Sequence, residues 1–196
     1  QGGLSARSLV SNSHVLAVCT SDDPVDSLEH HAVIAADESF ATRVFPTWRT
    51  DRVLGLSDPV SWNCYVDALG AAADVEITRF DDLITALAAR QEFFHRAGCR
   101  LSDHGLTTCP WSPAGEGEIT SHFDRIRSGV PLGPAEIDQL TTALLLELGR
   151  MYADRGWTMQ LHLGALRNSN RRMLAALGPD TGFDSIGDQQ YAEPLA

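Results

Sequence analysis

Short apolar runs alternate with longer stretches of helical periodicity along most of the chain. Apolar runs occupy residues 15–19, 42–46 and 158–163, and each has the length of a strand. A fourth short strand is expected at residues 99–105, where the sequence reads C-R-L-S-D-H-G. Short runs with β-branched residues and little alternation are typical of buried parallel strands. The pattern therefore predicts four strands, of which 15–19 and 158–163 should be buried.

The helix starts are marked by a capping residue followed by proline, a pair that suits the first turn of a helix. Such pairs occur at Asp23–Pro24, Asp58–Pro59 and Gly133–Pro134, and the first helix is expected to run to about Ala36. Apolar residues recur with helical spacing over residues 80–97. Shorter helices are expected at residues 119–127 and 170–177, and Gly98 and Gly156 stand where helices should end.

The order strand, polar tip, helix repeats about four times, which indicates a parallel sheet with right-handed crossovers and an α/β fold. The polar tips follow the carboxyl ends of the strands, where (β/α)8 barrels carry their active sites. Four units cannot close a barrel of eight. We expect residues 1–196 to form a single domain, a partial (β/α)8 TIM-type barrel of about four consecutive strand–helix units with extra helices.

The composition narrows the classes of partner. The 196 residues are 43% hydrophobic, which is enough for a real core, and the formal net charge is -11. This acidic balance disfavours nucleic acid and anionic membranes, because it would repel phosphate. No apolar run approaches the roughly 18 residues of a membrane span. A cytoplasmic protein is expected.

The lysine and cysteine content excludes further kinds of catalytic and metal site. Every basic residue is arginine, so the chain has no lysine for a Schiff base, a phosphate loop or a carbamylated metal bridge. The four cysteines show no C-x-x-C spacing, which argues against a zinc ribbon. We expect free thiols in a reducing compartment.

Candidate chemistry lies at the predicted strand ends. Residues 157–170 read W-T-M-Q-L-H-L-G-A-L-R-N-S-N, so the last strand delivers His162 and the loop after it carries Arg167 and Asn168. A neutral imidazole is a good zinc ligand and hydrogen-bond donor, although a lone histidine that ends an apolar strand is more often a satisfied core residue. Arg167 could bind a carboxylate or anchor its own loop.

Two earlier strand ends carry comparable residues. Arg49 follows the second strand, and its planar guanidinium suits both carboxylates and hydroxyls. The alternative is a salt bridge to Asp51 or Asp22. Asp103 and His104 are neighbours on a strand, so only one of them can face the mouth of the sheet unless the strand has ended.

Five blocks of sequence, in order and over nearly the whole chain, resemble the uronate isomerases, also called glucuronate isomerases, of the amidohydrolase superfamily. The blocks are T-S-D-D-P-V-D-S-L-E-H-H, F-P-T-W-R-T-D, G-C-R-L-S-D-H-G-L, R-G-W-T-M-Q-L-H-L-G-A-L-R-N-S-N and L-G-P-D-T-G-F-D-S-I-G-D. The resemblance implies a (β/α)8 barrel with one divalent metal, usually zinc. The implied reaction converts D-glucuronate to D-fructuronate, or D-galacturonate to D-tagaturonate, by proton transfer through an enediol in sugar-acid breakdown.

The chain departs from the family pattern at its metal site. The family's H-x-H pair belongs to the first strand and its metal-binding aspartate to the last, and no H-x-H occurs here. The chain therefore resembles the central part of such a barrel, lacking its first and last strands. We expect it to be inactive alone, with no metal of its own, and to act with missing complementary segments or as a homo-oligomer on a small uronate sugar acid.

The resemblance assigns roles to individual residues. Arg49 matches a substrate-contacting arginine and is expected to be catalytic and substrate-binding. His162 matches the histidine that ends the fifth strand, a catalytic residue and candidate metal ligand. Arg167, Asn168 and His104 are expected to bind substrate.

Two alternatives from other classes stay open. The first is a non-catalytic half-barrel that serves as an assembly unit, in which case open sheet edges should promote association. The second is a metal-dependent hydrolase of the same superfamily. The absence of a carbamylatable lysine weakens the dinuclear form of that alternative.

Overall fold

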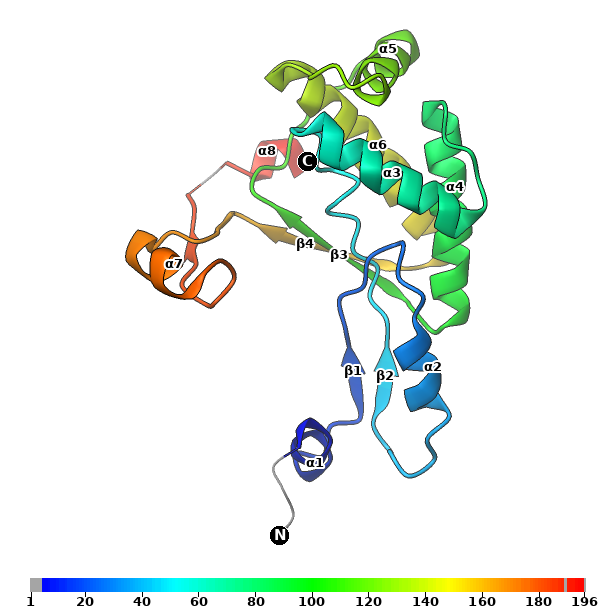
Figure 1. Cartoon of the computed structure of the whole chain (residues 1–196), viewed down its shortest axis with the longest axis vertical. Helices are drawn as coiled ribbons and strands as arrows, with labels where there is room; N and C mark the ends of the chain where they lie inside the picture. Colours follow the sequence, from blue (N-terminus) through cyan, green and yellow to red (C-terminus); the bar gives the residue numbers. More distant parts are fainter. Residues whose placement is uncertain (1–4, 189, 196) are drawn as a thin grey trace.

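The computed structural model describes residues 5–188 and 190–195, which form an α/β structure with several strand–helix units (Figure 1). The strands are β1 (Ala17–Cys19), β2 (Arg43–Phe45), β3 (Leu101–Leu106), β4 (Thr158–Leu163), β5 (Ala165–Leu166) and β6 (Ser185–Ile186). The helices are α1 (Ala6–Asn12), α2 (Glu29–Ala35), α3 (Pro59–Ala73), α4 (Phe80–Arg96), α5 (Glu116–Arg127), α6 (Pro134–Arg155), α7 (Arg171–Leu177) and α8 (Ala192–Leu195). The predicted α/β class is confirmed.

The first four strands form two parallel pairs that a single residue connects. β1 pairs with β2 over three positions, and β3 pairs with β4 over six. Trp48, just beyond β2, bridges to Asp22 on one side and to Ser102 on the other. The Trp48 N–H donates to the Leu101 carbonyl at 3.2 Å, and the Trp48 carbonyl accepts from the Asp103 N–H at 2.9 Å. The carboxyl ends of β1 and β2 therefore meet the beginning of β3.

The core lies between the β3–β4 pair and the helices α3, α4, α5 and α6, which gather on one side of it (Figure 1). Trp48 enters this core fully buried, and its ring packs edge-to-face on Phe94 with the ring centroids 4.9 Å apart. Leucines from the helices fill the rest: Leu69, Leu83, Leu87, Leu140, Leu144 and Leu148 are each fully buried. Burial of this apolar surface holds the helices to one face of the sheet.

Most helix boundaries follow the sequence signals. Asp58 caps α3, because its side chain accepts from the Val60 N–H, and α6 begins at the predicted Pro134. Gly98 and Gly156 follow α4 and α6 with φ of 97° and 64°, a conformation that glycine adopts without a steric penalty. These predictions are confirmed.

The sequence predicts a helix that starts at Pro24. This prediction is wrong, because α2 begins only at Glu29. Asp23 caps a turn instead, accepting from the Val25 N–H at 3.1 Å. The guanidinium of Arg90 in α4 donates to the carbonyls of Pro24 and Asp26 at 2.7 and 2.8 Å. Those carbonyls are the ones that the first helical turn would have used, so a tertiary contact replaces the helix.

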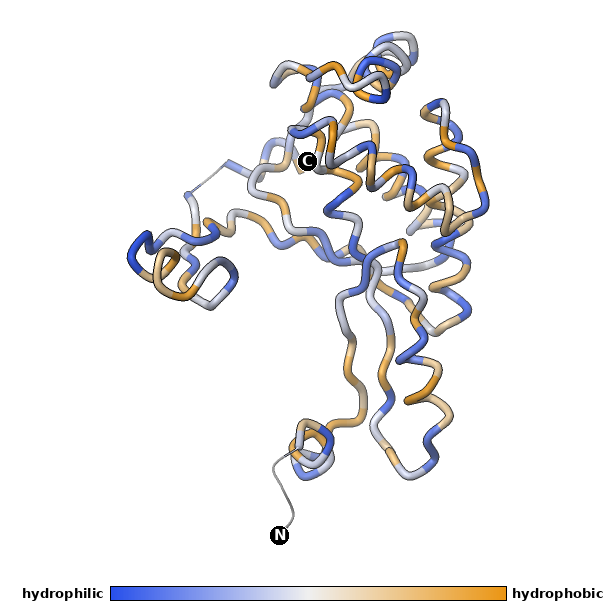
Figure 2. The backbone as a smooth tube through the Cα atoms, viewed as in Figure 1, coloured by the Kyte–Doolittle hydropathy of each residue, from blue (hydrophilic) through white to orange (hydrophobic). Residues whose placement is uncertain are grey.

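The expected burial of two strands is also wrong. β1 is exposed at both of its end positions, and Leu16 just before it is 82% exposed. β4 alternates between exposed and half-buried residues, so only one of its faces is covered. Figure 2 shows hydrophobic positions along the exposed β1–β2 pair as well as in the strands that helices cover. Burial here depends on neighbouring elements that the local sequence does not encode.

The segment that contains α7 forms a separate lobe beside the end of β4, whereas α8 returns to the helices of the core (Figure 1). β5 pairs antiparallel with β6, although neither is among the four predicted strands, and α7 begins after the capping residue Asn170. Among the helices of the described residues, none has the length and hydrophobicity needed to cross a bilayer.

Candidate active site

A polar cluster occupies the face of the β3–β4 pair opposite the helices, where the carboxyl ends of β1 and β2 approach. Asp103 in β3 and His162 in β4 both lie on this face, with Gly105 paired beside His162. Arg49 reaches the same place from the segment after β2. Arg49 and His162, two candidates far apart in the sequence, are thus brought together.

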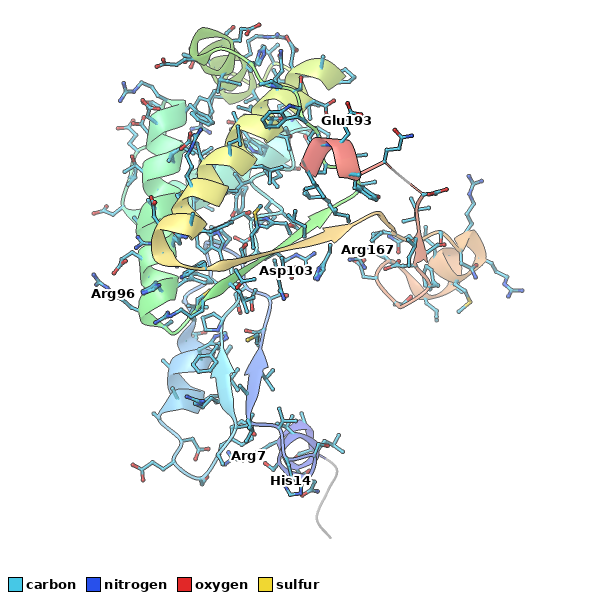
Figure 3. The ribbon with its side chains drawn as sticks, turned by 180° about the vertical axis from the view of Figure 1, so that it is seen from behind. Arg7, His14, Arg96, Asp103, Arg167 and Glu193 are labelled. Atoms are coloured by element: carbon cyan, nitrogen blue, oxygen red, sulfur yellow. The ribbon has the colours of Figure 1, made fainter. Side chains whose placement is uncertain are left out.

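Asp103 lies at the centre of the cluster (Figure 3). Its Oδ2 accepts from the Ser21 hydroxyl at 3.0 Å and from Arg49 Nη1 at 3.1 Å. Its Oδ1 lies 2.8 Å from Nδ1 of His162. Asp103 is only 4% exposed, whereas the His162 side chain is 56% exposed. The imidazole of His162 is therefore exposed to solvent while it contacts the buried carboxylate of Asp103.

Two carboxylates hold the Arg49 side chain. Its Nε donates to Asp51 Oδ2 at 2.8 Å, and Asp51 Oδ1 accepts from the Gly105 N–H at 3.0 Å. Burial opposes the charge, yet the hydrogen bonds and fields of Asp51 and Asp103 raise the pKa of Arg49 above its ordinary value. A Cβ on Gly105 would lie 2.8 Å from Arg49 Nη2, so glycine is required for the guanidinium to lie there.

His104 points to the opposite, helix-covered face of β3, as strand alternation requires. Its ring is fully buried, with Nδ1 3.2 Å from the Thr50 hydroxyl and Nε2 3.1 Å from the Ser102 hydroxyl. Burial lowers its pKa to about 4. With both ring nitrogens occupied, His104 is placed as a core residue and away from the polar cluster where it was expected to bind substrate.

Arg167 and Asn168 lie in the C-terminal lobe, where Asp184 engages both of them. Asp184 accepts from Arg167 Nη1 at 2.6 Å and from the Asn168 N–H at 2.9 Å, and these bonds lower the pKa of its carboxyl. Figure 3 shows Arg167 on the lobe side of Asp103. Asp184 fixes the loop, and the structure does not join Arg167 to the Asp103 cluster.

Sequence reasoning missed Ser21 and Asp51 as members of the cluster. Asp51 was considered only as the partner in a surface salt bridge, and that salt bridge exists, but its second oxygen also binds β3. Its signal was the W-R-T-D spacing, which places a carboxylate two residues after Arg49. Ser21 had no signal, because its contact with Asp103 spans 82 positions.

A cleft of about 270 Å³ opens beside Arg49. It is lined by Ser21, Asp22, Asp23, Asp26, Arg49, Asp51 and Arg52. The acidic members are partly structural: Asp22 accepts from the Thr47 N–H at 3.1 Å, and Asp23 accepts from the Tyr65 hydroxyl at 2.9 Å. With four carboxylates against two guanidinium groups, the cleft attracts neutral polar groups more readily than a second anion.

The cluster offers a metal ion one ligand position. A histidine whose Nδ1 faces a carboxylate and whose ring is half exposed has the arrangement of a metal ligand with its supporting carboxylate. Across residues 5–188 and 190–195, however, no three His, Cys, Asp or Glu side chains are grouped to hold a metal. The described residues alone therefore do not fit a complete metal site.

Comparison with known proteins gives a consistent result. The glucuronate isomerase family model matches residues 1–196. The uronate isomerases of Cellvibrio japonicus and Salmonella newport are both 48% identical to the chain, over 192 and 196 residues, in each case 98% of the chain and 41% of the relative. The chain thus spans about two fifths of the length of these relatives.

Two solved structures are similar to the fold. The crystal structure of uronate isomerase from Thermotoga maritima superposes with a TM-score of 0.86 at 31% identity, over 96% of this chain and 42% of that one. The crystal structure of glucuronate isomerase from Caulobacter crescentus gives 0.85 at 25% identity, over 100% and 40%.

Proposed function

Because the chain belongs to the glucuronate isomerase family, we propose that its polar cluster is part of the active site of a uronate isomerase. The proposed reaction interconverts D-glucuronate and D-fructuronate, or D-galacturonate and D-tagaturonate. The observation that carries the proposal is the convergence of Arg49 and His162 on Asp103 at the strand ends. Enzymes of α/β architecture build their sites at that end of the sheet.

The cluster suits the charge that this isomerisation develops. A proton moves between C2 and C1 of the sugar through an enediol, so an oxygen near the reacting carbons becomes negative. A fixed guanidinium such as Arg49 stabilises such an oxygen because it is already oriented before the reaction. The half-exposed His162 imidazole can bond a substrate hydroxyl beside it.

The charges also suggest how a uronate lies. The Nε and Nη1 atoms of Arg49 already bind Asp51 and Asp103, so part of this guanidinium is committed to carboxylates of the chain itself. The cleft beside it is net acidic. We therefore place the hydroxyl and carbonyl oxygens of the substrate at Arg49 and the substrate carboxylate away from it.

The metal belongs to the same proposal. We propose that the complete protein uses one divalent metal, zinc, which supplies Lewis-acid polarisation of substrate oxygens when bound. His162 is the residue of this chain that could reach it, either directly or through substrate. The other ligands would come from outside the described residues, and the steps assigned to Arg49 and His162 do not depend on the metal.

The remaining features of the complete protein are proposals on the same basis. The parallel strands would continue into a (β/α)8 barrel, completed by further segments or by a homo-oligomeric partner, since the chain spans 41% of its relatives. Its four free cysteines suit the cytoplasm. The isolated chain would not isomerise uronates.

The test is a coupled reductase assay of D-glucuronate turnover. We expect the complete protein that carries this sequence to be active and the purified 196-residue chain to be inactive with added zinc. In the complete protein, Arg49→Lys should lower kcat/KM by about 10²-fold, the usual loss on removing one preorganised donor. Arg7→Lys is the matched control, because Arg7 binds Asp37 and Ser39 near the N-terminus. Unchanged turnover in Arg49→Lys would remove Arg49 from the mechanism.

A further inference from the structure

We propose that Asp103 is a positioning residue that fixes the tautomer of His162 and the place of Arg49 without touching substrate. The inference rests on the proposed function only for the identity of the ligand. The positions of the side chains, and the tautomer that they impose, are properties of the free chain.

The placement of Asp103 is that of an organising group. It sits in β3 with a side chain 6% exposed, and it is engaged from the three other parallel strands. Ser21 comes from the segment after β1, Arg49 from the segment after β2, and His162 from β4. A carboxylate has about four acceptor positions, so one side chain can hold all three partners at once. Too deeply buried to meet a sugar, it acts through its partners.

The Oδ1 atom of Asp103 identifies the tautomer. This buried oxygen is 2.8 Å from Nδ1 of His162 and has no other partner within the described part of the chain. The ring N–H is not well aligned with it, but the half-exposed imidazole can rotate to improve the angle. A buried acceptor left unbonded is costly, so Nδ1 is expected to carry the proton.

That tautomer determines what His162 can do. An ionised carboxylate only accepts, so the neutral ring must hold its proton on Nδ1 and its lone pair on Nε2. Nε2 is then an acceptor for a substrate hydroxyl or a ligand for a metal. With the opposite tautomer Nε2 would carry the proton, so it could neither accept a hydrogen bond from the hydroxyl nor ligate a metal.

Asp51 supplies the matched control. It also holds Arg49, through Nε, but it contacts the Gly105 N–H rather than His162. Asp51→Asn therefore perturbs the same arginine without touching the imidazole. Asp103→Asn, by contrast, replaces one carboxylate oxygen with an NH₂ group, which cannot accept from Arg49 or Ser21. The acceptor that faces Nδ1 of His162 is therefore lost or weakened.

The experiment is ¹⁵N NMR of the full chain with labelled histidine, without substrate and at a pH where His162 is neutral. The His162 resonances are assigned with His162→Gln. We expect an excess of about tenfold of the Nδ1–H tautomer in the native chain, the size of one charge-assisted hydrogen bond. Asp51→Asn should keep that excess, and Asp103→Asn should bring the two tautomers within about threefold of each other.

Each outcome decides the inference. A native chain with the proton on Nε2 overturns it, as does a loss of the excess in Asp51→Asn equal to that in Asp103→Asn. If Asp103→Asn does not fold by circular dichroism, the native spectrum and the Asp51→Asn spectrum still decide. Because no turnover is measured, an absence of isomerase activity would count against the proposed function and leave this inference standing.

Discussion

The β1–β2 pair and the β3–β4 pair are both parallel, but they differ in length and cover. Three positions pair in the first and six in the second. Residues of β1 are half-buried at best, whereas β3 contains the buried Ser102, Asp103 and His104. Helices α3, α4, α5 and α6 gather on one face of the β3–β4 pair, whereas α2 lies against the β1–β2 pair (Figure 1).

The comparison shows that a hydrophobic sequence does not by itself make a strand buried. The run around β1 is as apolar as that of a core strand, yet Leu16 is 82% exposed because no helix among the described residues covers it. β3 is polar in sequence, yet its side chains are buried because helices cover one face and Arg49, Ser21 and Asp51 crowd the other. Neighbouring elements therefore decide burial, and the following predictions test that conclusion in order of expected effect.

The largest effect should come from the core behind β3. Phe94→Ala removes a fully buried ring that packs on Trp48, and we expect it to lower the free energy of unfolding by about 3–5 kcal/mol. Leu16→Ala, beside β1, should change that free energy by no more than about 0.5 kcal/mol. Urea denaturation followed by circular dichroism measures both. Similar losses in the two variants would contradict the contrast between the strand pairs.

An intermediate effect should appear as a pH dependence from His104. Burial lowers its pKa in the folded chain to about 4 from an ordinary value of 6.5, so below pH 6.5 the unfolded chain takes up a proton that the folded chain does not. Stability from this residue is therefore full above pH 6.5 and decreases as pH falls toward 4, by about 3 kcal/mol in all.

The comparison is with His104→Gln, whose amide can still bond the hydroxyls of Thr50 and Ser102 but does not titrate. Urea midpoints at several pH values between 7 and 4.5 should fall less steeply in this variant. An equal slope in both chains would mean that the buried face of β3 is more hydrated than the packing indicates.

The smallest effect should come from the polar face of β3. Gly105→Ala places a methyl group 2.8 Å from Arg49 Nη2 and 3.0 Å from Asp51 Oδ2, and we expect a loss of about 1–3 kcal/mol as these groups move. Gly149→Ala in α6 meets nothing within 4 Å and should be neutral or stabilising by about 0.5–1 kcal/mol. Thermal unfolding of the two variants gives the difference, and a harmless Gly105→Ala would show that Arg49 is loosely held.

Sequence patterns predicted a helix boundary correctly where residues at that boundary determine it. The Asp58 cap and the glycines after α4 and α6 behave as their residue types require. The signal at Asp23 failed because Arg90, far along the chain, binds the carbonyls that the helix would have used. A capping pattern thus predicts a helix only where no distant donor competes for its first turn.

The candidate site was predictable to a similar extent. Arg49 and His162 could be selected, because each follows or ends a strand and has useful chemistry. Their common partner Asp103 could not be ranked above His104, because the face on which each residue of β3 lies depends on the register with β4. The pairing of Arg167 with Asp184 also depends on β5 and β6, for which the sequence has no strand signal.

Trp48 couples the packing of the core to the geometry of the polar cluster. Its backbone is bonded to β3 and its indole is fully buried, while the next residue in the chain is Arg49. A change of volume beneath the indole would shift the peptide that carries Arg49 relative to Asp103. In a lineage of such proteins, substitutions under this tryptophan and substitutions around the guanidinium should be inherited together, since each one changes the fitness of the other.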